Sequence, residues 1–419
     1  MKLLSPGRLW QHKDFMRLWS SQTIEAVGGE FTNLAMPALA KFLFDVGPME
    51  MGTLLGLQML PVPILGMFVG VWADRWRRRP IMITANFGRM LALAWVPIGF
   101  TLRILNLHQL YLVALLLGIF TVFYDVANQS YLPSLIEREN LIEGNSKLQT
   151  TQSGAQLVGP SVAGYLIDLL GGKAIGAAKA FAVEAGGFLC SALLIFSIKT
   201  PEAPLHSVEQ NFARELKEGA RIVFNNRLLR SITACTAILN FGSGIYFAVV
   251  YLFMYDQLNL SIGTVGIIFS VAAVGFLVGA LSAPRIAQIL GLGPALAVSI
   301  VFQGAWLALV PFAVYGAAVP LVALFLMLSN IGIPIYNINQ VSLRQAVTPD
   351  EIQGRMNATV RVIIRGAIPI GYFVGGILGT QFGIVPTLII GAVTSTVGVI
   401  FLFVKPVRTL GGIPNIAAH

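Results

Sequence analysis

The stretch Gly70-Val71-Trp72-Ala73-Asp74-Arg75-Trp76-Arg77-Arg78-Arg79-Pro80 places four arginines and an aspartate between two apolar runs, at 51–69 and 81–101. Each run is close to the ~20 residues that a helix needs to cross a bilayer. Arginine at the bilayer centre costs roughly 2.5 kcal/mol or more, and short basic loops stay on the cytoplasmic side. The stretch therefore predicts a tight cytoplasmic turn between two membrane-spanning helices.

The composition is that of a membrane protein. Hydrophobic residues make up 56% of the 419 residues and charged residues 11%, and the mean hydropathy is +0.76, whereas soluble domains carry about 25% charged residues. The net charge of +9 does not indicate nucleic-acid binding, because the basic residues lie between apolar runs. Cys190 and Cys235 both lie inside apolar runs, which argues against a disulfide framework or a zinc site.

Twelve apolar runs predict an all-α membrane protein with twelve transmembrane helices. The runs lie at 18–44, 51–72, 81–101, 110–132, 149–170, 175–198, 231–255, 262–290, 294–315, 319–341, 356–382 and 385–404. A polar stretch separates the sixth run from the seventh and contains an expected surface helix at 212–224. We therefore expect two pseudo-symmetric six-helix bundles, at 1–198 and 231–419, the second with a short cytoplasmic tail, joined by a cytoplasmic linker at 199–230.

The placement of basic residues supports an even number of spans. Most of the 28 Lys and Arg residues fall in the loops and tails expected on the inner face, whereas the expected outer loops carry only Arg103 and Lys173. With an odd number of spans, the basic loops would no longer all lie on the cytoplasmic side. We expect a multi-pass protein of the inner (plasma) membrane with both termini in the cytoplasm.

A short repeated pattern indicates that one half is a copy of the other. The fourth run contains Tyr124-Asp125-Val126-Ala127-Asn128-Gln129, and the tenth contains Tyr336-Asn337-Ile338-Asn339-Gln340. Parallel six-span repeats occur in transporters, where the binding site lies near the membrane midplane between the repeats. The repeat therefore predicts a transporter with a central cavity.

Several motifs resemble those of one transporter family. Gly70-x-x-x-Asp74-Arg75-x-x-Arg78-Arg79 resembles the signature loop of the major facilitator superfamily, although Arg77 stands where that family usually has a glycine. Further pieces resemble the branch with enterobactin exporters and macrolide-efflux proteins: Phe15-x-Arg17-Leu18-Trp19, Glu184-Ala185-x-x-Phe188-Leu189-x-Ser191-Ala192, Arg214-Glu215-Leu216-x-Glu218-Gly219-x-Arg221 and Gly354-Arg355. The resemblance implies the two-bundle facilitator fold and transport of small molecules.

The fifth run carries a glycine and proline motif. Gly154, Gly159, Pro160 and Gly164 resemble the motif that drug/proton antiporters of this family carry in the same span. Proline removes a backbone donor and kinks a helix, while glycine lets a neighbouring helix approach closely. The resemblance implies export. The alternative is ordinary glycine-rich packing, which the run at 356–382 also shows.

Three acidic residues lie inside apolar runs, where an ionisable group is a functional candidate. Glu30 is the first candidate for proton coupling, because at 1.5 Å per residue it lies roughly 20 Å from the inner boundary near Arg17, close to the midplane. Glu25 is the second candidate and Glu184 the third. Burial favours the uncharged form of a carboxylate, so such a group can bind and release a proton as access alternates. The alternative is an acid that is paired with a neighbouring helix.

The resemblance also implies a gate at the cytoplasmic face. It pairs Arg78 with Asp125, and Asp74 with the start of the eleventh run, where a helix N-terminus favours negative charge. Arg89 is a competing partner for Asp125. The expected gate residues are Asp74, Arg75, Arg78, Asp125, Arg89 and Arg361.

Polar and aromatic residues toward the middle of several runs predict the substrate cavity. The candidates are Phe31, Asn33, Asn240, Tyr246, Asn337 and Arg365. Arg361 and Arg365 share a helix face, because they are four residues apart. For Arg365 two roles stay possible from the sequence, in an anion site of the cavity or in the gate. Apolar walls with few polar groups suit amphiphilic organic molecules.

The hypothesis that follows is a proton antiporter that exports a drug or a siderophore-like metabolite. The alternatives are an uptake symporter of a small organic solute and, in another class, a non-transporting membrane scaffold. All four histidines lie outside the runs, and no catalytic or nucleotide-binding motif is present, so we expect no enzyme. The expected partners are the small-molecule substrate, protons and the lipid bilayer. We expect no nucleic acid, cofactor or metal, and a monomer.

Overall fold

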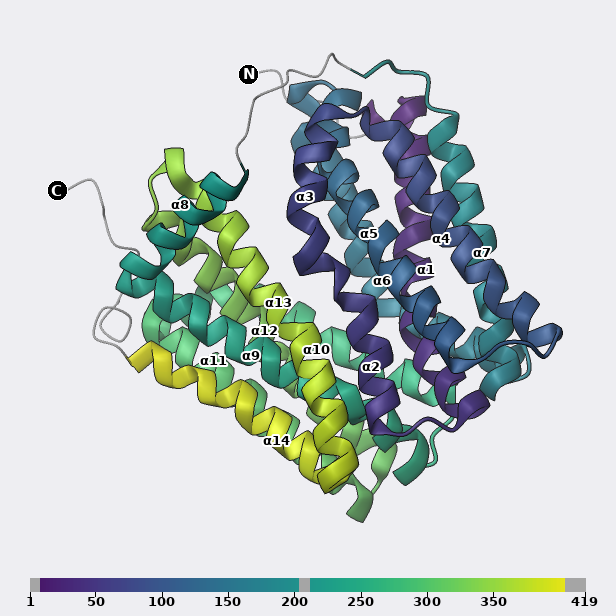
Figure 1. Cartoon of the computed structure of the whole chain (residues 1–419). Helices are drawn as coiled ribbons and strands as arrows, with labels where there is room; N and C mark the ends of the chain where they lie inside the picture. Colours follow the sequence, from purple (N-terminus) through teal and green to yellow (C-terminus); the bar gives the residue numbers. More distant parts are fainter. Residues whose placement is uncertain (1–7, 203–211, 404–419) are drawn as a thin grey trace. The chain divides into compact units, whose positions relative to one another are not determined.

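Helices form the regular structure of this chain, as lipid requires, because a helix satisfies its own backbone polar groups. The computed structural model describes residues 8–202 and 212–403, and no strand occurs in these ranges. Contacts divide the chain into two units (Figure 1). Unit 1 comprises Met1–Phe44 and Ile64–Glu209, and unit 2 comprises Asp45–Pro63 and Gln210–His419.

The first half of the chain forms seven α-helices. They are α1 (Lys13–Phe44), α2 (Pro48–Met59), α3 (Pro61–Arg75), α4 (Arg78–Thr101), α5 (Leu107–Leu135), α6 (Leu141–Leu169) and α7 (Lys173–Phe196), with 3-10 turns at Arg8–Gln11 and Arg138–Asn140. Local signals set several ends. Asn106, for example, accepts a hydrogen bond from the backbone N–H of Gln109 at 2.9 Å and so caps α5.

The second half forms another seven. They are α8 (Phe212–Asn225), α9 (Arg227–Leu252), α10 (Ile262–Leu290), α11 (Leu292–Leu309), α12 (Ala318–Ala346), α13 (Asp350–Phe382) and α14 (Ile384–Val397); a π-helical turn follows α9 at Phe253–Gln257, and 3-10 turns follow α11 at Val310–Tyr315 and α14 at Gly398–Phe403. Gly291, with a φ of 82°, ends α10 in the left-handed region that favours glycine.

Helix α1 is central to the packing of unit 1. It lies against α7 and α6, while α7 also packs on α4 and α4 on α5 (Figure 1). At the end where α1 and α4 begin and α7 ends, Phe15, Leu18, Met82, Tyr131 and Ile195 form a buried apolar cluster. This cluster fixes the relative positions of the helices that carry the acids described below.

Close helix approaches hold unit 2 together. Helix α9 packs on α13 and α14, and α12 packs on α10 and α11. At the contact between α9 and α13, a Cβ at Gly244 would lie 2.9 Å from the Cα of Gly371, so only glycine permits this spacing. Helix α2 packs on α13 within this unit, whereas the sequence predicts the segment in the first bundle.

The apolar runs predict most helices well. The run at 262–290 is α10 with the same bounds. The run at 51–72, expected as one span, is instead divided between α2 and α3, because Pro61 has no backbone N–H and starts a new helix. Nine helices within the described ranges are long and apolar enough to cross a membrane. The count of twelve spans stays a prediction.

Candidate functional site

The interior of unit 1 holds a buried polar network around Glu25. One carboxylate oxygen of Glu25 accepts hydrogen bonds from the Nδ2 of Asn86 at 2.7 Å and from the hydroxyl of Ser191 at 2.6 Å. The other oxygen lies 3.1 Å from the Nη2 of Arg89, with which it forms an ion pair. The network joins α1, α4 and α7, and it satisfies Glu25 with three donors.

Two aromatic rings contact the guanidinium of Arg89. Its guanidinium lies 4.4 Å from the ring centroid of Tyr124 and 4.5 Å from that of Phe188. Such cation–π contacts are worth about 2 kcal/mol when desolvated. With 5% of its surface exposed, Arg89 needs this shell, because a buried charge without partners is costly. The guanidinium of Arg89 forms its ion pair with Glu25, and the expectation that Arg89 competes for Asp125 stays a prediction.

Glu184 on α7 is the most buried of the three acids, with 4% of its surface exposed. Its Oε1 accepts a hydrogen bond from the hydroxyl of Thr32 on α1 at 2.6 Å. Its Oε2 is buried and has no hydrogen-bond partner among the described residues. The side chain passes close to Gly28, where an added Cβ would lie 3.6 Å from the Cγ of Glu184.

Glu30 on α1 packs against the glycine motif of α6. A Cβ at Gly159 would lie 2.6 Å from the Cγ of Glu30, so the bare glycine backbone provides the space for this side chain. The side-chain amide of Asn33 is a hydrogen-bond partner of the carboxylate. Gly154, one and a half turns earlier on α6, has open space at its Cβ position.

The three acids differ in whether a basic side chain pairs with them. Glu25 has a fixed positive partner in Arg89. Within the described part of the chain, no Lys or Arg side chain forms an ion pair with Glu30 or Glu184. A buried charge is costly unless it is paired, and a carboxylate can instead be neutralised by a proton. Glu30 and Glu184 are therefore the acids suited to proton exchange, and Glu25 is suited to a structural ion pair.

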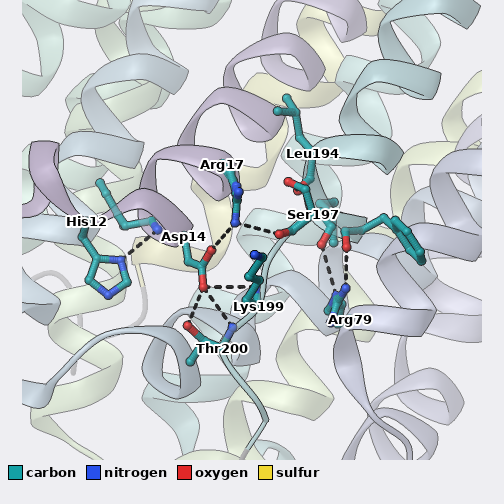
Figure 2. A network of polar contacts seen from close by, with 11 residues as sticks. His12, Asp14, Arg17, Arg79, Leu194, Ser197, Lys199 and Thr200 are labelled. Carbon is teal, nitrogen blue, oxygen red and sulfur yellow. Dashed lines mark hydrogen bonds and ion pairs between the residues drawn. The ribbon is translucent and has the colours of Figure 1, made fainter.

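A second polar network ties the start of α1 to the chain that leaves α7 (Figure 2). The Oδ2 of Asp14 accepts hydrogen bonds from the backbone N–H groups of Lys199, at 3.1 Å, and Thr200, at 2.9 Å, and from the Thr200 hydroxyl at 2.6 Å. Arg17 donates to the Oδ1 of Asp14 and to the carbonyl oxygen of Ser197, each at 2.7 Å. This network anchors α1 outside the span expected from residue 18 onward.

Hydrogen bonding lowers the pKa of Asp14. Burial is the largest single contribution and acts in the opposite direction, by disfavouring the charged carboxylate. The hydrogen bonds from Thr200, Arg17 and Lys199 together outweigh it and lower the pKa to about 2. Asp14 therefore stays charged at physiological pH.

The predicted gate residues are only partly described. The side chains of Asp74 and Arg75 lie outside the described residues. Arg78 donates its backbone N–H to Glu202 at 2.8 Å, and its Nε is buried without a hydrogen-bond partner among the described residues. Asp125 on α5 and Arg361 on α13 are exposed. The gate stays a prediction for all of these residues.

The predicted cavity residues have different surroundings within their own units. Phe31 and Tyr246 are buried, and Asn240 donates to the carbonyl oxygen of Ile364 at 2.7 Å. Asn33, Asn337 and Arg365 are exposed. Exposure alone does not distinguish a side chain in a cavity from one at the lipid surface, so the role of these three as cavity residues stays a prediction.

The sequence did not identify the partners of the buried acids. Asn86, Ser191 and Thr32 each donate to a carboxylate of unit 1. The sequence did carry a signal for Asn86, because it is the one amide side chain in the apolar run at 81–101. Which acid it would meet depends on how α1, α4 and α7 pack, and that is a property of the fold.

The described residues contain no cluster of three or more His, Cys, Asp or Glu side chains that could hold a metal ion. The buried network around Glu25 brings together a carboxylate, an amide, a hydroxyl and the guanidinium of Arg89. An all-helical fold with nine potential spans and buried acids is typical of a membrane transporter.

This chain belongs to the Major Facilitator Superfamily, whose sequence profile matches residues 18–358 and, in a second match, 232–418. Members of this family are transporters and not enzymes, as the sequence predicts for this chain. The family also confirms a multi-pass membrane protein.

Curated relatives confirm the branch that the motifs indicate. Macrolide efflux protein A of Streptococcus pyogenes is 24% identical over 388 residues, which cover 90% of this chain and 91% of that protein. Enterobactin exporter EntS of Escherichia coli O1:K1 / APEC is 24% identical over 364 residues, covering 85% and 82%. The uncharacterized MFS-type transporter YfiS of Bacillus subtilis (strain 168) is 27% identical over 237 residues, covering 54% of this chain and 53% of that protein.

Solved structures show the same fold. A bacterial homologue of the iron transporter ferroportin in an inward-facing state matches with a TM-score of 0.74 and 18% identity, over 93% of this chain and 99% of the other. The nucleoside transporter NupG (D323A mutant) matches with a TM-score of 0.74 and 14% identity, over 93% and 100%. At these identities the likeness concerns the fold alone.

Proposed function

We propose that this protein exports amphiphilic small molecules, such as a drug or a siderophore-like metabolite, in exchange for protons. Two curated relatives that align with most of the chain are named as a macrolide efflux protein and an enterobactin exporter. The glycine and proline motif of α6 supports export rather than uptake. The substrate would enter a central cavity between two six-helix bundles by alternating access.

The observation that carries the proton coupling is the setting of Glu30. Its side chain packs on Gly159 and has no ion pair among the described residues. Proton binding neutralises such a carboxylate, and a positively charged substrate can replace the proton. Glu184 is the second candidate, because one of its oxygens is buried without a hydrogen-bond partner. Glu25 contributes the ion pair that holds α1 and α4 together.

Proton entry supplies the work of export. The membrane potential alone provides about 2.3 kcal/mol per charge per 100 mV. In this mechanism Asp74, Arg75, Arg78, Asp125 and Arg361 close the cytoplasmic side, and release of these contacts opens it. We further propose twelve spans, a monomer and both termini in the cytoplasm, in accordance with the distribution of Lys and Arg.

Dye transport in reconstituted liposomes tests this function. Full-length protein should expel a fluorescent cationic dye when a proton gradient is imposed, and an uncoupler should abolish the transport. Glu30→Gln cannot ionise, so it should lower the gradient-driven rate at least tenfold. Glu137→Gln is the matched control, because Glu137 is an exposed acid of the same unit; its rate should be unchanged.

Each part of the proposal can fail separately. Dye efflux that survives Glu30→Gln and still collapses with an uncoupler would remove Glu30 as the coupling group and leave antiport intact. Wild-type protein that transports equally well without a gradient is not an antiporter. Dye uptake driven by the same gradient would identify a symporter, and no transport of any retained compound would favour a scaffold.

A further inference from the structure

An open pocket of about 620 Å³ lies at the end of unit 1 where α4 begins and α7 ends. Three cationic side chains line it: Arg77 and Arg79 at the start of α4, and Lys199 just after α7. Its apolar part includes Ile83 and Phe196. The pocket belongs to neither the buried acids nor the expected central cavity.

The acidic residue in this pocket is already engaged. Both carboxylate oxygens of Glu202 accept backbone N–H groups at the N-terminus of α4, from Arg78 at 2.8 Å and from Arg79 at 2.7 Å. A carboxylate at this position compensates the positive end of the helix dipole. Glu202 therefore leaves the three cationic side chains with a net positive charge for a ligand.

The cationic side chains of the pocket retain N–H groups that can donate hydrogen bonds to a ligand. Arg79 uses its Nε and Nη2 to donate to the carbonyl oxygens of Ile195 and Phe196, which hold the guanidinium in place. A guanidinium has five N–H groups, so others remain. Arg77 and Lys199 are exposed, and within the described ranges neither side chain forms an ion pair.

A second, apolar groove of about 400 Å³ adjoins the pocket. It runs between α4 and α5, and it shares Arg77, Pro80 and Thr84 with the cationic pocket. Phe120 and Phe123 form part of its apolar wall. Trp76, which also lines the groove, is the residue type that concentrates at membrane interfaces. A charged pocket thus continues into an apolar groove at an expected lipid-facing surface.

We propose that these two adjoining hollows bind one anionic phospholipid. The phosphodiester lies between Arg77 and Lys199, with Arg79 as a third donor, and an acyl chain lies in the groove between α4 and α5. Basic pockets beside membrane helices on the cytoplasmic side recognise anionic headgroups in this way. A soluble phosphorylated compound would use the pocket but would leave the apolar groove empty.

Native mass spectrometry of the purified full-length protein tests the proposal, and it requires no transport activity. The probes are phosphatidylglycerol, phosphatidylcholine with the same acyl chains, and glycerol phosphate. The variant Arg77→Gln/Lys199→Gln should weaken phosphatidylglycerol binding at least about tenfold, because each basic residue beside an anionic headgroup contributes to the binding free energy. Arg138→Gln, which removes an exposed arginine outside the pocket, should leave binding within about twofold.

A second variant tests the groove. Thr84 is exposed and lies where the two hollows meet. Thr84→Trp should fill this junction and weaken phosphatidylglycerol binding without a change of charge. Three results would overturn the proposal: equal binding of phosphatidylcholine, binding of glycerol phosphate as tight as that of the lipid, or unchanged lipid binding in both variants. Melting temperatures measured without lipid identify any variant that has not folded.

Discussion

Glu30 on α1 lies in contact with the bare backbone of Gly159 on α6. A Cβ placed at Gly159 would lie 2.6 Å from the Cγ and 3.1 Å from the Cβ of Glu30. Real Cβ atoms do not approach other carbon atoms at the shorter of these distances, so any side chain at Gly159 must displace Glu30 or separate the helices. Gly159 of the glycine motif and the half-buried Glu30 are therefore parts of one arrangement in unit 1.

We expect Gly159→Ala to impair transport. The added methyl group pushes the Glu30 side chain from its position, so the gradient-driven rate of dye efflux should fall about tenfold, and overpacking should lower the stability by ~1–3 kcal/mol. Gly154→Ala is the matched control on the same helix, because nothing lies within 4 Å of its Cβ position. Equal rates for the two variants would show that Gly159 does not position Glu30.

The spans could be predicted from sequence because their signal is local. A run of about 20 apolar residues can reach across a bilayer only as a helix, so the run at 262–290 gave the bounds of α10. The same reasoning overlooked the break at Pro61, although proline carries its own local signal. The unit to which α2 belongs depends on its contact with α13, which no local pattern encodes.

The acids of the candidate site were predictable, but their partners were not. A glutamate in an apolar run is conspicuous by its cost in lipid, which singled out Glu25, Glu30 and Glu184. The pairing of Glu25 with Arg89 joins residues 64 positions apart and requires α1 and α4 to meet α7 in one particular rotation. Sequence spacing along a single helix cannot give that rotation between helices.

Removal of either partner of the Glu25 and Arg89 ion pair should be destabilising. Each residue is buried, with side-chain exposures of 9% and 6%, so Glu25→Gln or Arg89→Gln leaves an uncompensated charge and should cost ~3–5 kcal/mol. The double variant Glu25→Gln/Arg89→Gln removes both charges and should recover part of this loss. A double-mutant cycle on the free energy of unfolding should give a coupling of ~1–3 kcal/mol.

An exposed ion pair of unit 2 provides the control for this cycle. Arg355 and Glu218 are 2.8 Å apart, with side-chain exposures of 44% and 36%. Because solvent screens such a pair, its coupling should be below ~1 kcal/mol. Similar coupling energies in the two cycles would mean that the Glu25 and Arg89 pair contributes no more than a surface contact.

The low pKa of Asp14 predicts a pH-dependent contribution to stability. Its pKa falls from the ordinary value of 3.8 to about 2 in the folded protein. A lowered pKa stabilises the fold fully above pH ~4, and the contribution is lost as the pH falls toward 2. We expect about 1 kcal/mol, allowing for partial solvent screening. In thermal unfolding measured from pH 6 to pH 2, the melting temperature of the wild type should exceed that of Asp14→Asn at pH 6 and equal it at pH 2. Glu137→Gln should show no such trend, and a constant gap for Asp14→Asn would contradict the assignment.

The contact between α10 and α12 should tolerate no side chain at Gly275. A Cβ there would overlap the carbonyl oxygen of Met327 and lie 2.8 Å from its carbonyl carbon. Backbone atoms cannot move aside as a flexible side chain can, so Gly275→Ala should lower the free energy of unfolding by at least ~1–3 kcal/mol. Gly354→Ala is the control in the same unit, because nothing lies within 4 Å of its Cβ position; in a helix this change should be neutral or stabilising by up to ~1 kcal/mol. Chemical denaturation of the two purified variants measures both values, and a Gly275→Ala variant as stable as wild type would show that α10 and α12 are not packed this closely.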